Sequence, residues 1–320
     1  MIDALGTQLF VLHANAWSGY LASHLFPRAS VLPWRADLTA DESINALARL
    51  AAESSSEAAL LFHIDLSDTR NTPRDRPALL HGLRSRNITA LNAGCCDLSR
   101  RRLQARLREL ALNTVSIDQH TAEDTPVIIK TDPNHGGAPE LRLSAWERAA
   151  LGITFEGAWL GSARAYRVLP LRNVPAEVLT HADYAVERYV ENASGMFYRA
   201  YVSGTAVLVV KAHCVHQIKV ICGDPRDENW ALHIDELAHL SVEAIPAKVA
   251  QAIAALAMGE GLHFGAIDLV EDDRGEPFII DLNTTPWAGK RPIDHEIAEF
   301  LREGFLEGAK LRQMGVAQHA

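Results

Sequence analysis

The chain has 320 residues, of which 48% are hydrophobic and 22% are charged, the ordinary make-up of a globular protein with two or three packed subdomains. Its formal net charge of −9 at pH 7 argues against nucleic acid as a partner, since phosphate binding requires a basic surface. The four cysteines are too few for a disulfide framework, no apolar run suits a membrane span, and the first residues do not resemble a signal peptide, so we expect a cytoplasmic protein.

The first part of the chain alternates short apolar runs with one helical pattern. Residues 8–12 and 58–64 read as buried strands, and residues 41–54 predict a helix between them with Asp41 as its N-cap. This alternation predicts a small parallel sheet, and the loops that follow such strands commonly carry ligand groups. The candidate substrate residues are therefore the polar ones after the two strands, His13, Asn15, Ser18, Asp65 and Asp68.

The next part of the chain places a lysine beside a glycine-containing loop. A basic amphipathic helix is expected over 97–112, followed by a strand at 125–130 that ends in Lys130. An ammonium group and a mobile glycine backbone hold phosphates together at many sites, although a lysine at a strand end is more often an ordinary surface residue. The candidate phosphate-binding residues are Lys130, His135, Gly136 and Gly137.

Two further cations lie in a β-rich segment. Strands are expected near 164–170 and 184–190, and as a pair over 197–213. Arg199 and Lys211 belong to this pair, and a charge that is buried among apolar residues requires a partner. An anionic ligand would be such a partner.

Residues 264–283 read as two strands joined by a tight turn. Centring the turn on residues 274–275 sets the register of the two strands, and opposed residues share a face. One face then carries two opposed pairs, Asp268 with Asp281 and Val270 with Ile279. The other face is expected to be core, formed by Ile267, Leu269, Phe278, Ile280 and Leu282.

The opposed carboxylates predict a metal site. Two carboxylates roughly 5 Å apart across strands repel one another, and a hard cation removes this cost. Mg²⁺ commonly takes one or two carboxylates together with phosphate oxygens of a substrate. Asn283 lies two residues beyond Asp281 and points the same way, so the predicted ligands are Asp268, Asp281 and Asn283. The alternative is an exposed strand face whose acids are merely solvated.

Taken together and in this order, these segments resemble the ATP-grasp superfamily, in particular its carboxylate–amine ligases such as the ribosomal-protein glutamate ligases and the D-alanine–D-alanine ligases. Residues 127–137 resemble its lysine strand and phosphate-closing loop, 186–195 its inter-lobe hinge, 197–213 its two cationic strands, and 265–283 its metal hairpin. The resemblance implies an α/β protein in which two α+β lobes sandwich ATP, preceded by a small parallel-sheet domain. The implied domains are 1–95 for that first domain, 96–186 for the N-lobe with the lysine strand, and 187–320 for the C-lobe with the hinge and the hairpin.

The resemblance also implies how the nucleotide is held. Main-chain atoms at Arg188, Tyr189 and Val190 would read the adenine. Glu187 begins this segment and would help to position the adenine, while Glu191 would take the ribose hydroxyls.

The remaining cations receive the catalytic and substrate roles in this resemblance. Arg199 and Lys211 would spread the charge of the transferring phosphoryl group, and Lys211 would also contact the nucleotide. Lys290 and Arg291 follow the hairpin and would meet an acidic substrate. No protein nucleophile is required for this chemistry.

Three positions depart from the superfamily pattern. Asp281 stands where a glutamate is usual, which shortens the reach but keeps an oxygen ligand. Ala266 stands where several members have arginine. The upstream lysine that normally contacts the nucleotide is replaced by arginines, of which Arg101 or Arg102 is the candidate substitute.

The implied activity is Mg–ATP-dependent activation of a carboxylate as an acyl phosphate, followed by attack of an amine that forms a carbon–nitrogen bond. The cofactors are ATP and Mg²⁺, and the partners are small-molecule carboxylate and amine substrates of the amino acid or small-peptide type. The sequence identifies neither substrate, and a homodimer is one possible assembly.

Other functions stay open. A kinase on the same scaffold would phosphorylate a small hydroxyl compound and would not depend on an amine. A nucleotide-binding protein without turnover would fit the missing lysine and Ala266. A zinc site is disfavoured because adjacent strand residues point to opposite faces; its ligands would be His213, Cys214, His216 and Cys222.

Overall fold

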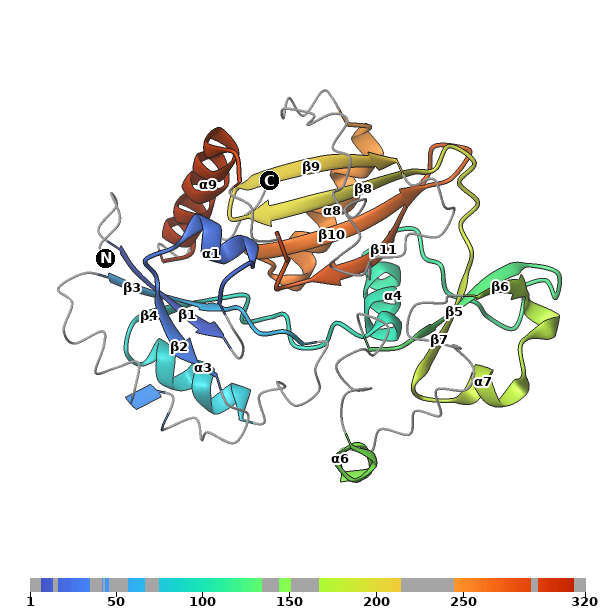
Figure 1. Ribbon diagram of the computed structural model, residues 1–320, viewed down its shortest axis with the longest axis horizontal. Helices are drawn as coiled ribbons and strands as arrows, with labels where there is room; N and C mark the ends of the chain where they lie inside the picture. Colours follow the sequence, from blue (N-terminus) through green and yellow to red (C-terminus); the bar gives the residue numbers. More distant parts are fainter. Residues whose placement is uncertain are drawn as a thin grey trace.

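The computed structural model describes residues 7–13, 17–34, 42, 44–45, 57–66, 75–133, 144–150, 167–213, 245–288 and 293–313. Within these residues the strands form three sheets, and helices cover their faces (Figure 1). None of the described helices combines the length with the apolar character that a membrane crossing requires. The expected helix over 41–54 lies largely outside the described residues.

The N-terminal sheet is parallel, as the alternation of apolar runs predicts. Its elements are β1 (Thr7–His13), α1 (Leu21–Leu25), β2 (Ser30–Pro33), β3 (Glu57–Phe62), α3 (Arg76–Arg84) and β4 (Ile88–Leu91). The strand order is β2-β1-β3-β4, so the two predicted strands, β1 and β3, occupy the centre. Side chains alternate along β1: Val11 packs with α1, whereas Phe10 and Leu12 pack with α3 on the opposite face.

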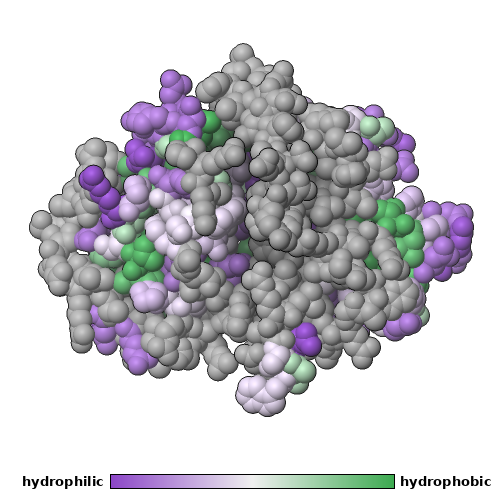
Figure 2. All heavy atoms as spheres, viewed as in Figure 1, coloured by the Kyte–Doolittle hydropathy of each residue, from purple (hydrophilic) through white to green (hydrophobic). Residues whose placement is uncertain are grey.

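The smallest sheet is antiparallel, with strand order β6-β5-β7. Its elements are β5 (Pro126–Thr131), β6 (Arg167–Pro170), the 3-10 helix η3 (Leu171–Asn173), α7 (Ala176–Thr180) and β7 (Tyr184–Arg188), and α6 (Ala145–Ala150) lies between β5 and β6 in the chain. Val127 and Ile129 of β5 pack beneath η3 and α7, so Lys130 lies on the opposite face. In Figure 2 apolar atoms reach the surface at the end of the molecule formed by β6 and α7, where Val168 and Leu179 are each 40% exposed.

The third sheet is antiparallel, with strand order β11-β10-β8-β9. Its elements and the helices against it are α4 (Arg100–Glu109), β8 (Met196–Ser203), β9 (Ala206–His213), α8 (Ala247–Glu260), β10 (Phe264–Glu271), β11 (Pro277–Asn283) and α9 (His295–Gln313). One face packs on α4 and α8. Against the other lies α9, whose Phe305 ring is 4.7 Å from Phe26 of the N-terminal unit and 6.1 Å from Phe264 of β10, measured between centroids. A single core therefore joins the first and third sheets through α9.

The turn between β8 and β9 packs directly on α9. Gly204 has a φ of +63°, and a Cβ atom there would overlap the Gly304 carbonyl oxygen. We expect Gly204→Ala to lower the free energy of unfolding by about 3 kcal/mol or more, because backbone strain and overlap add. Gly275→Ala is the matched control, since Gly275 has a φ of +77° but nothing within 4 Å, and its cost should be about 1–2 kcal/mol. Urea unfolding measures both losses, and equal losses would contradict the role of the close approach.

The hairpin of β10 and β11 has the predicted pairing of its acids but a different register near the turn. Asp268 lies opposite Asp281, which confirms that part of the prediction. Val270, however, lies opposite Phe278 and not opposite Ile279, so that part of the prediction is wrong.

The turn itself explains the difference. It spans residues 272–276 and is closed by a hydrogen bond from the Asp272 N–H to the Glu276 carbonyl, so its centre is Arg274, half a residue from the expected centre. Ile280 is an extra residue in β11, and the bulge at this point brings the two acids back into register.

The bulge also exchanges side chains between the two faces of the hairpin. Ile279, expected beside the acids, packs in the core under α4 and α8, whereas Phe278, expected in that core, packs with Val270 on the other face. Ile280 also packs on the side of Phe278, contrary to the prediction. The remaining expected core residues are in the core: Ile267, Leu269 and Leu282.

Candidate active site

Three strands of the third sheet place three charges side by side. Arg199 on β8 and Asp281 on β11 both lie opposite Asp268 on the central strand β10. The Nη1 atom of Arg199 is 3.6 Å from Oδ2 of Asp268, which is only 3% exposed. Burial alone lowers the pKa of Arg199, but the charges of Asp268, Tyr201 and Asp281 act the other way and raise it overall. The arginine therefore stays charged beside the acid pair.

A second ion pair lies between the strands of the smallest sheet. Nζ of Lys130 on β5 is 2.7 Å from Oε2 of Glu187 on β7, and the two residues are 8% and 3% exposed. Burial lowers the pKa of the Lys130 ammonium, and Glu187 opposes this shift. Removing both charges of this pair from water costs free energy. A pair buried to this degree at the end of β5 is therefore a candidate functional feature.

The two ion pairs lie on different sheets, but the charge of Asp281 acts on both. After burial and Glu187, the groups that shift the pKa of Lys130 are Arg100, which lowers it, and Asp281, which raises it. Lys130 of the smallest sheet thus lies within electrostatic range of Asp281 of the third sheet. The candidate site is formed between these two sheets.

Helix α4 holds the hairpin at its bulge. A bulge leaves ladder groups of its strand unpaired. Arg100 Nη1 donates a hydrogen bond to the Ile280 carbonyl at 3.0 Å, and Gln104 Nε2 donates one to the Ile279 carbonyl at 3.3 Å. These side chains satisfy the bulge, and Arg100, which is 6% exposed, brings a third cation to the site.

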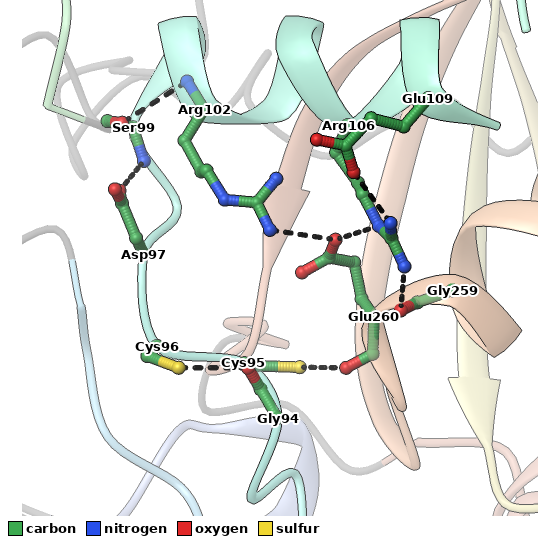
Figure 3. A network of polar contacts seen from close by, with 10 residues as sticks. All are labelled: Gly94, Cys95, Cys96, Asp97, Ser99, Arg102, Arg106, Glu109, Gly259 and Glu260. Atoms are coloured by element: carbon green, nitrogen blue, oxygen red, sulfur yellow. Dashed lines mark hydrogen bonds and ion pairs between the residues drawn. The ribbon is translucent and has the colours of Figure 1, made fainter.

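Another side of α4 contacts the end of α8 (Figure 3). Nε of Arg106 is 3.0 Å and Nη2 of Arg102 is 3.9 Å from Oε1 of Glu260, the last residue of α8. Arg106 Nη2 also donates to the Gly259 carbonyl at 2.6 Å. These contacts fix the rotation of α4 and therefore the direction of its buried face.

The arginine that reaches the site is Arg100, whereas Arg101 or Arg102 was the predicted substitute for the upstream lysine. Arg101 Nη2 donates to two main-chain carbonyls at and just before the start of β7, and Arg102 reaches Glu260. Arg100, one residue earlier, is the member of the run that lies near Lys130.

Cys95, which is buried beside these contacts between α4 and α8, has no role as a nucleophile. Cys95 Sγ donates to the Glu260 carbonyl at 3.5 Å, as Figure 3 shows. Burial, followed by the charge of Glu260, raises the pKa of the Cys95 thiol to about 12. The thiol therefore stays protonated and unreactive at neutral pH.

The expected hinge, residues 186–195, begins in the last three residues of β7, and some of its main-chain N–H groups already donate hydrogen bonds. The N–H of Arg188 donates to the Val115 carbonyl at 2.6 Å, and the N–H of Tyr189 donates to the Pro126 carbonyl at 2.8 Å. An adenine would therefore be read at carbonyl oxygens of this segment or at the N–H of Val190. Glu191 is exposed at the following position.

Asn283 ends β11 and turns the chain. Its Oδ1 accepts from the Thr285 N–H at 2.7 Å and from the Thr285 hydroxyl at 3.3 Å. Among the residues described, no three histidine, cysteine, aspartate or glutamate side chains are grouped as a metal site. A metal at the acid pair would therefore complete its shell with other oxygens, such as those of Asn283, phosphate or water.

No family model and no curated protein matches the sequence. Solved structures do match. The ATP-grasp ligase PsnB complexed with minimal precursor has a TM-score of 0.52 and 16% identity, over 95% of this chain and 100% of that chain. The same ligase complexed with a phosphomimetic variant of minimal precursor, Mg and ADP has a TM-score of 0.51 and 15% identity, over 94% and 98% of the two chains. The D-alanine–D-alanine ligase from Coxiella burnetii has a TM-score of 0.49 and 11% identity, over 97% and 98%.

The agreement with PsnB extends over almost the whole of both chains. This chain has the ATP-grasp fold. The fold class inferred from the hairpin, the lysine strand and the hinge is thereby confirmed, and the candidate site described above lies between two sheets of this fold.

In the ATP-grasp fold of this chain, the predicted substrate residues follow strands of the N-terminal sheet. His13 ends β1 and is 2% exposed, Ser18 is exposed before α1, and Asp65 is half-buried after β3. The Thr284 hydroxyl donates to the Ile64 carbonyl at 3.0 Å, so this edge of the sheet adjoins the end of the β10–β11 hairpin. Their role in binding stays a prediction.

Several predicted residues lie outside the described part of the chain. Lys211 lies on β9 opposite Tyr198, but its side chain is not among those described. The others are Asn15, Asp68, His135, Gly136, Gly137, Lys290 and Arg291.

Two residues of this region, Arg100 and His63, were not predicted, although the sequence contains a pattern that indicates a buried position for each. Arg100 precedes the buried Leu103 and Leu107 by three and seven residues, which places it on the inner face of α4. His63 lies inside an apolar strand run, where a polar ring requires a partner.

Proposed function

We propose that this chain is a Mg–ATP-dependent ligase that activates a carboxylate as an acyl phosphate and joins it to an amine. The observation that supports it most is the opposed pair Asp268 and Asp281, with Arg199 across the sheet and Lys130 within range of Asp281. Paired acids and convergent cations between two sheets of an ATP-grasp fold suit a polyphosphate with its metal. The structure of PsnB, whose fold this chain shares, has been solved in complex with a phosphomimetic variant of minimal precursor, Mg and ADP.

The acid pair fits a magnesium ion by the chemistry of its donors. Mg²⁺ prefers oxygen ligands and usually keeps phosphate and water oxygens beside one or two carboxylates. Asp268 and Asp281 would supply the carboxylates. The Asn283 amide oxygen at the end of β11 accepts from the Thr285 N–H and hydroxyl, so it would join the ion by giving up one of these hydrogen bonds. When bound there, the ion would neutralise charge on the phosphate oxygens.

The chain's own residues would then position the nucleotide and stabilise charge. Lys130 and Arg199 would face the transferring phosphoryl group, and buried cations stabilise such charge more than solvated ones do. Lys211, which was expected to act with them, is opposite Tyr198 in the strand pairing, and this register assigns it to the other face of the sheet from Arg199. The segment from Arg188 to Val190 would hold the adenine and Glu191 the ribose. Because the acyl phosphate forms on the substrate, orientation by the fold replaces a protein nucleophile.

In this proposal the domain boundaries follow the resemblance. Residues 1–95 would carry the substrate side, 96–186 the N-lobe and 187–320 the C-lobe, in a cytoplasmic enzyme.

The proposal is tested by measuring ADP release with amino acids and small peptides, singly and in pairs. A ligase releases ADP with a carboxylate and an amine together, and mass spectrometry shows a product lacking one water. ADP release with a stable phosphorylated product and no need for an amine would show a kinase instead. Binding of Mg–ATP without ADP release across the panel would contradict turnover.

The run of three arginines in α4 offers an internal comparison. We expect Arg100→Met to weaken binding of Mg–ATP about tenfold, because a buried charge-assisted contact is lost beside Lys130. Arg102→Met is the matched control and should change it little, since the Arg102 side chain is 41% exposed and reaches Glu260. Isothermal titration calorimetry measures both, and a larger effect at Arg102 would contradict the assignment.

A further inference from the structure

A cluster of rings closes the carboxyl edge of the N-terminal sheet, where that edge adjoins the end of the metal hairpin. His13 ends β1, and His63 follows β3, with ring centroids 4.9 Å apart. Trp17 lies 5.4 Å from each of these rings. Tyr20 lies 4.8 Å from His13 and 5.3 Å from His63 and from Trp287, which follows β11.

The hydrogen bonds of the two imidazoles assign their protons. Nδ1 of His13 is 3.0 Å from the His63 carbonyl oxygen, which only accepts, so His13 Nδ1 carries a proton. The same Nδ1 is 3.1 Å from Nδ1 of His63, which must therefore be the acceptor. His63 is neutral, in keeping with a pKa that burial and the neighbouring His13 lower well below its ordinary value. Its proton is then on Nε2.

This assignment leaves a buried N–H donor on each of two neighbouring rings without a partner in the described part of the chain. His63 is 0% exposed, and its Nε2 has no hydrogen-bond partner among the described residues. The indole Nε1 of Trp17 is also buried and, in the same part of the structure, has no partner. An unmet buried donor costs about 1–3 kcal/mol, so two on rings whose centroids are 5.4 Å apart favour an acceptor from outside the fold.

Among the described residues, the walls of this place are aromatic rings. The rings nearest to His63 are those of His13, Trp17, Tyr20 and Phe264, and the last lies 5.9 Å away. A carboxylate held only by neutral donors in such surroundings would bear a large desolvation cost, whereas an amide carbonyl would bear little. Trp287 is 42% exposed and forms the outer side of the cluster.

We infer that the His63 Nε2–H and the Trp17 Nε1–H together bind the carbonyl oxygen of an uncharged amide in the substrate. This inference rests on the proposed ligase function, because it assigns the two donors to substrate recognition. Asp268 lies four residues along β10 from Phe264, about 14 Å at the rise of an extended strand. The amide is therefore a recognition group held away from the reacting carboxylate, and a substrate that spans both has the length of a short peptide.

The test is side-chain NMR of the full chain with ¹⁵N-labelled histidine and tryptophan, using N-acetyl-alanine amide as the neutral probe and acetate as the charged one. We expect a His63 signal of the Nε2–H tautomer, and saturable shifts of the His63 and Trp17 N–H signals with the amide but not with acetate. An Nδ1–H tautomer, the absence of shifts, or tighter binding of acetate would overturn the inference.

Matched variants separate a lost donor from a damaged fold. Trp17→Phe keeps a ring and removes only the indole N–H, so we expect the amide to bind about fivefold more weakly. Trp146→Phe, at a side chain 78% exposed on α6, should leave the affinity unchanged. His63→Gln keeps a donor near the Nε2 position and should bind more tightly than His63→Leu. Equal affinity of the wild-type and Trp17→Phe proteins for the amide would overturn the inference.

The result is independent of turnover. The NMR titration needs no nucleotide, whereas the proposed ligase is tested by ADP release. Amide binding without ADP release in the substrate panel would refute the ligase and keep the amide site, and ADP release without amide binding would do the reverse.

Discussion

Asp281→Asn is expected to reduce the rate of ADP formation by about 10²–10³-fold while the protein remains folded. The substitution removes one charge from the opposed acid pair but keeps the size of the side chain. Asp281 is half-buried at the edge strand β11, and its partner Asp268 retains Arg199 as a counter-charge. The loss should therefore appear in binding of Mg–ATP and in turnover rather than in stability. Calorimetric titration with ATP, with and without Mg²⁺, checks the first, and ADP release with the substrates found in the panel checks the second.

Asp273→Asn is the matched control on the same hairpin. Asp273 is exposed in the turn and accepts a hydrogen bond from the Ala193 N–H at 2.9 Å, away from the acid pair. Its amide variant should turn over at the wild-type rate. Normal turnover by Asp281→Asn, or equal losses in the two variants, would show that the acid pair does not hold the metal.

The acid pair was predictable because strand geometry alone places it. Opposed residues of a hairpin share a face, and the turn between the two runs of this hairpin is legible in the sequence. The bulge at Ile280 could not be predicted from the sequence. The one-residue shift depends on how Asp272 closes the turn and on hydrogen-bond donors from α4, which are distant in sequence. The error therefore fell on the apolar residues nearest to the turn, where register is set by the turn.

The arginine run shows a different limit. Three consecutive helical residues point in directions about 100° apart, so only one of them faces the interior. The leucine spacing identifies Arg100 as that residue, whereas the substitute predicted from the resemblance was Arg101 or Arg102. The tautomer of His63 could not be predicted for a third reason. It follows from a contact with His13, fifty residues earlier in the chain, and no local sequence pattern contains that contact.

Lys130→Met is expected to lower the free energy of unfolding by about 3–5 kcal/mol and to abolish ADP formation. Glu187 would then remain as an unpaired charge in a site where it is 3% exposed, and this accounts for most of the loss of stability. If so, the double variant Lys130→Met, Glu187→Met should recover most of the stability, because an apolar pair of similar volume replaces a buried ion pair at little cost. It should not recover ADP formation, since the cation near Asp281 is still missing.

The exposed pair of Lys248 and Glu276 provides the comparison for the buried one. Its side chains are 60% and 38% exposed, so Lys248→Met should cost at most about 1 kcal/mol. Urea unfolding of the wild type, Lys130→Met, the double variant and Lys248→Met measures what the Lys130–Glu187 pair contributes to stability. This separates that contribution from the role of Lys130 toward phosphate. A double variant as unstable as Lys130→Met would show that the loss does not come from the stranded charge of Glu187. A double variant that forms ADP normally would show that Lys130 has no part in binding the nucleotide.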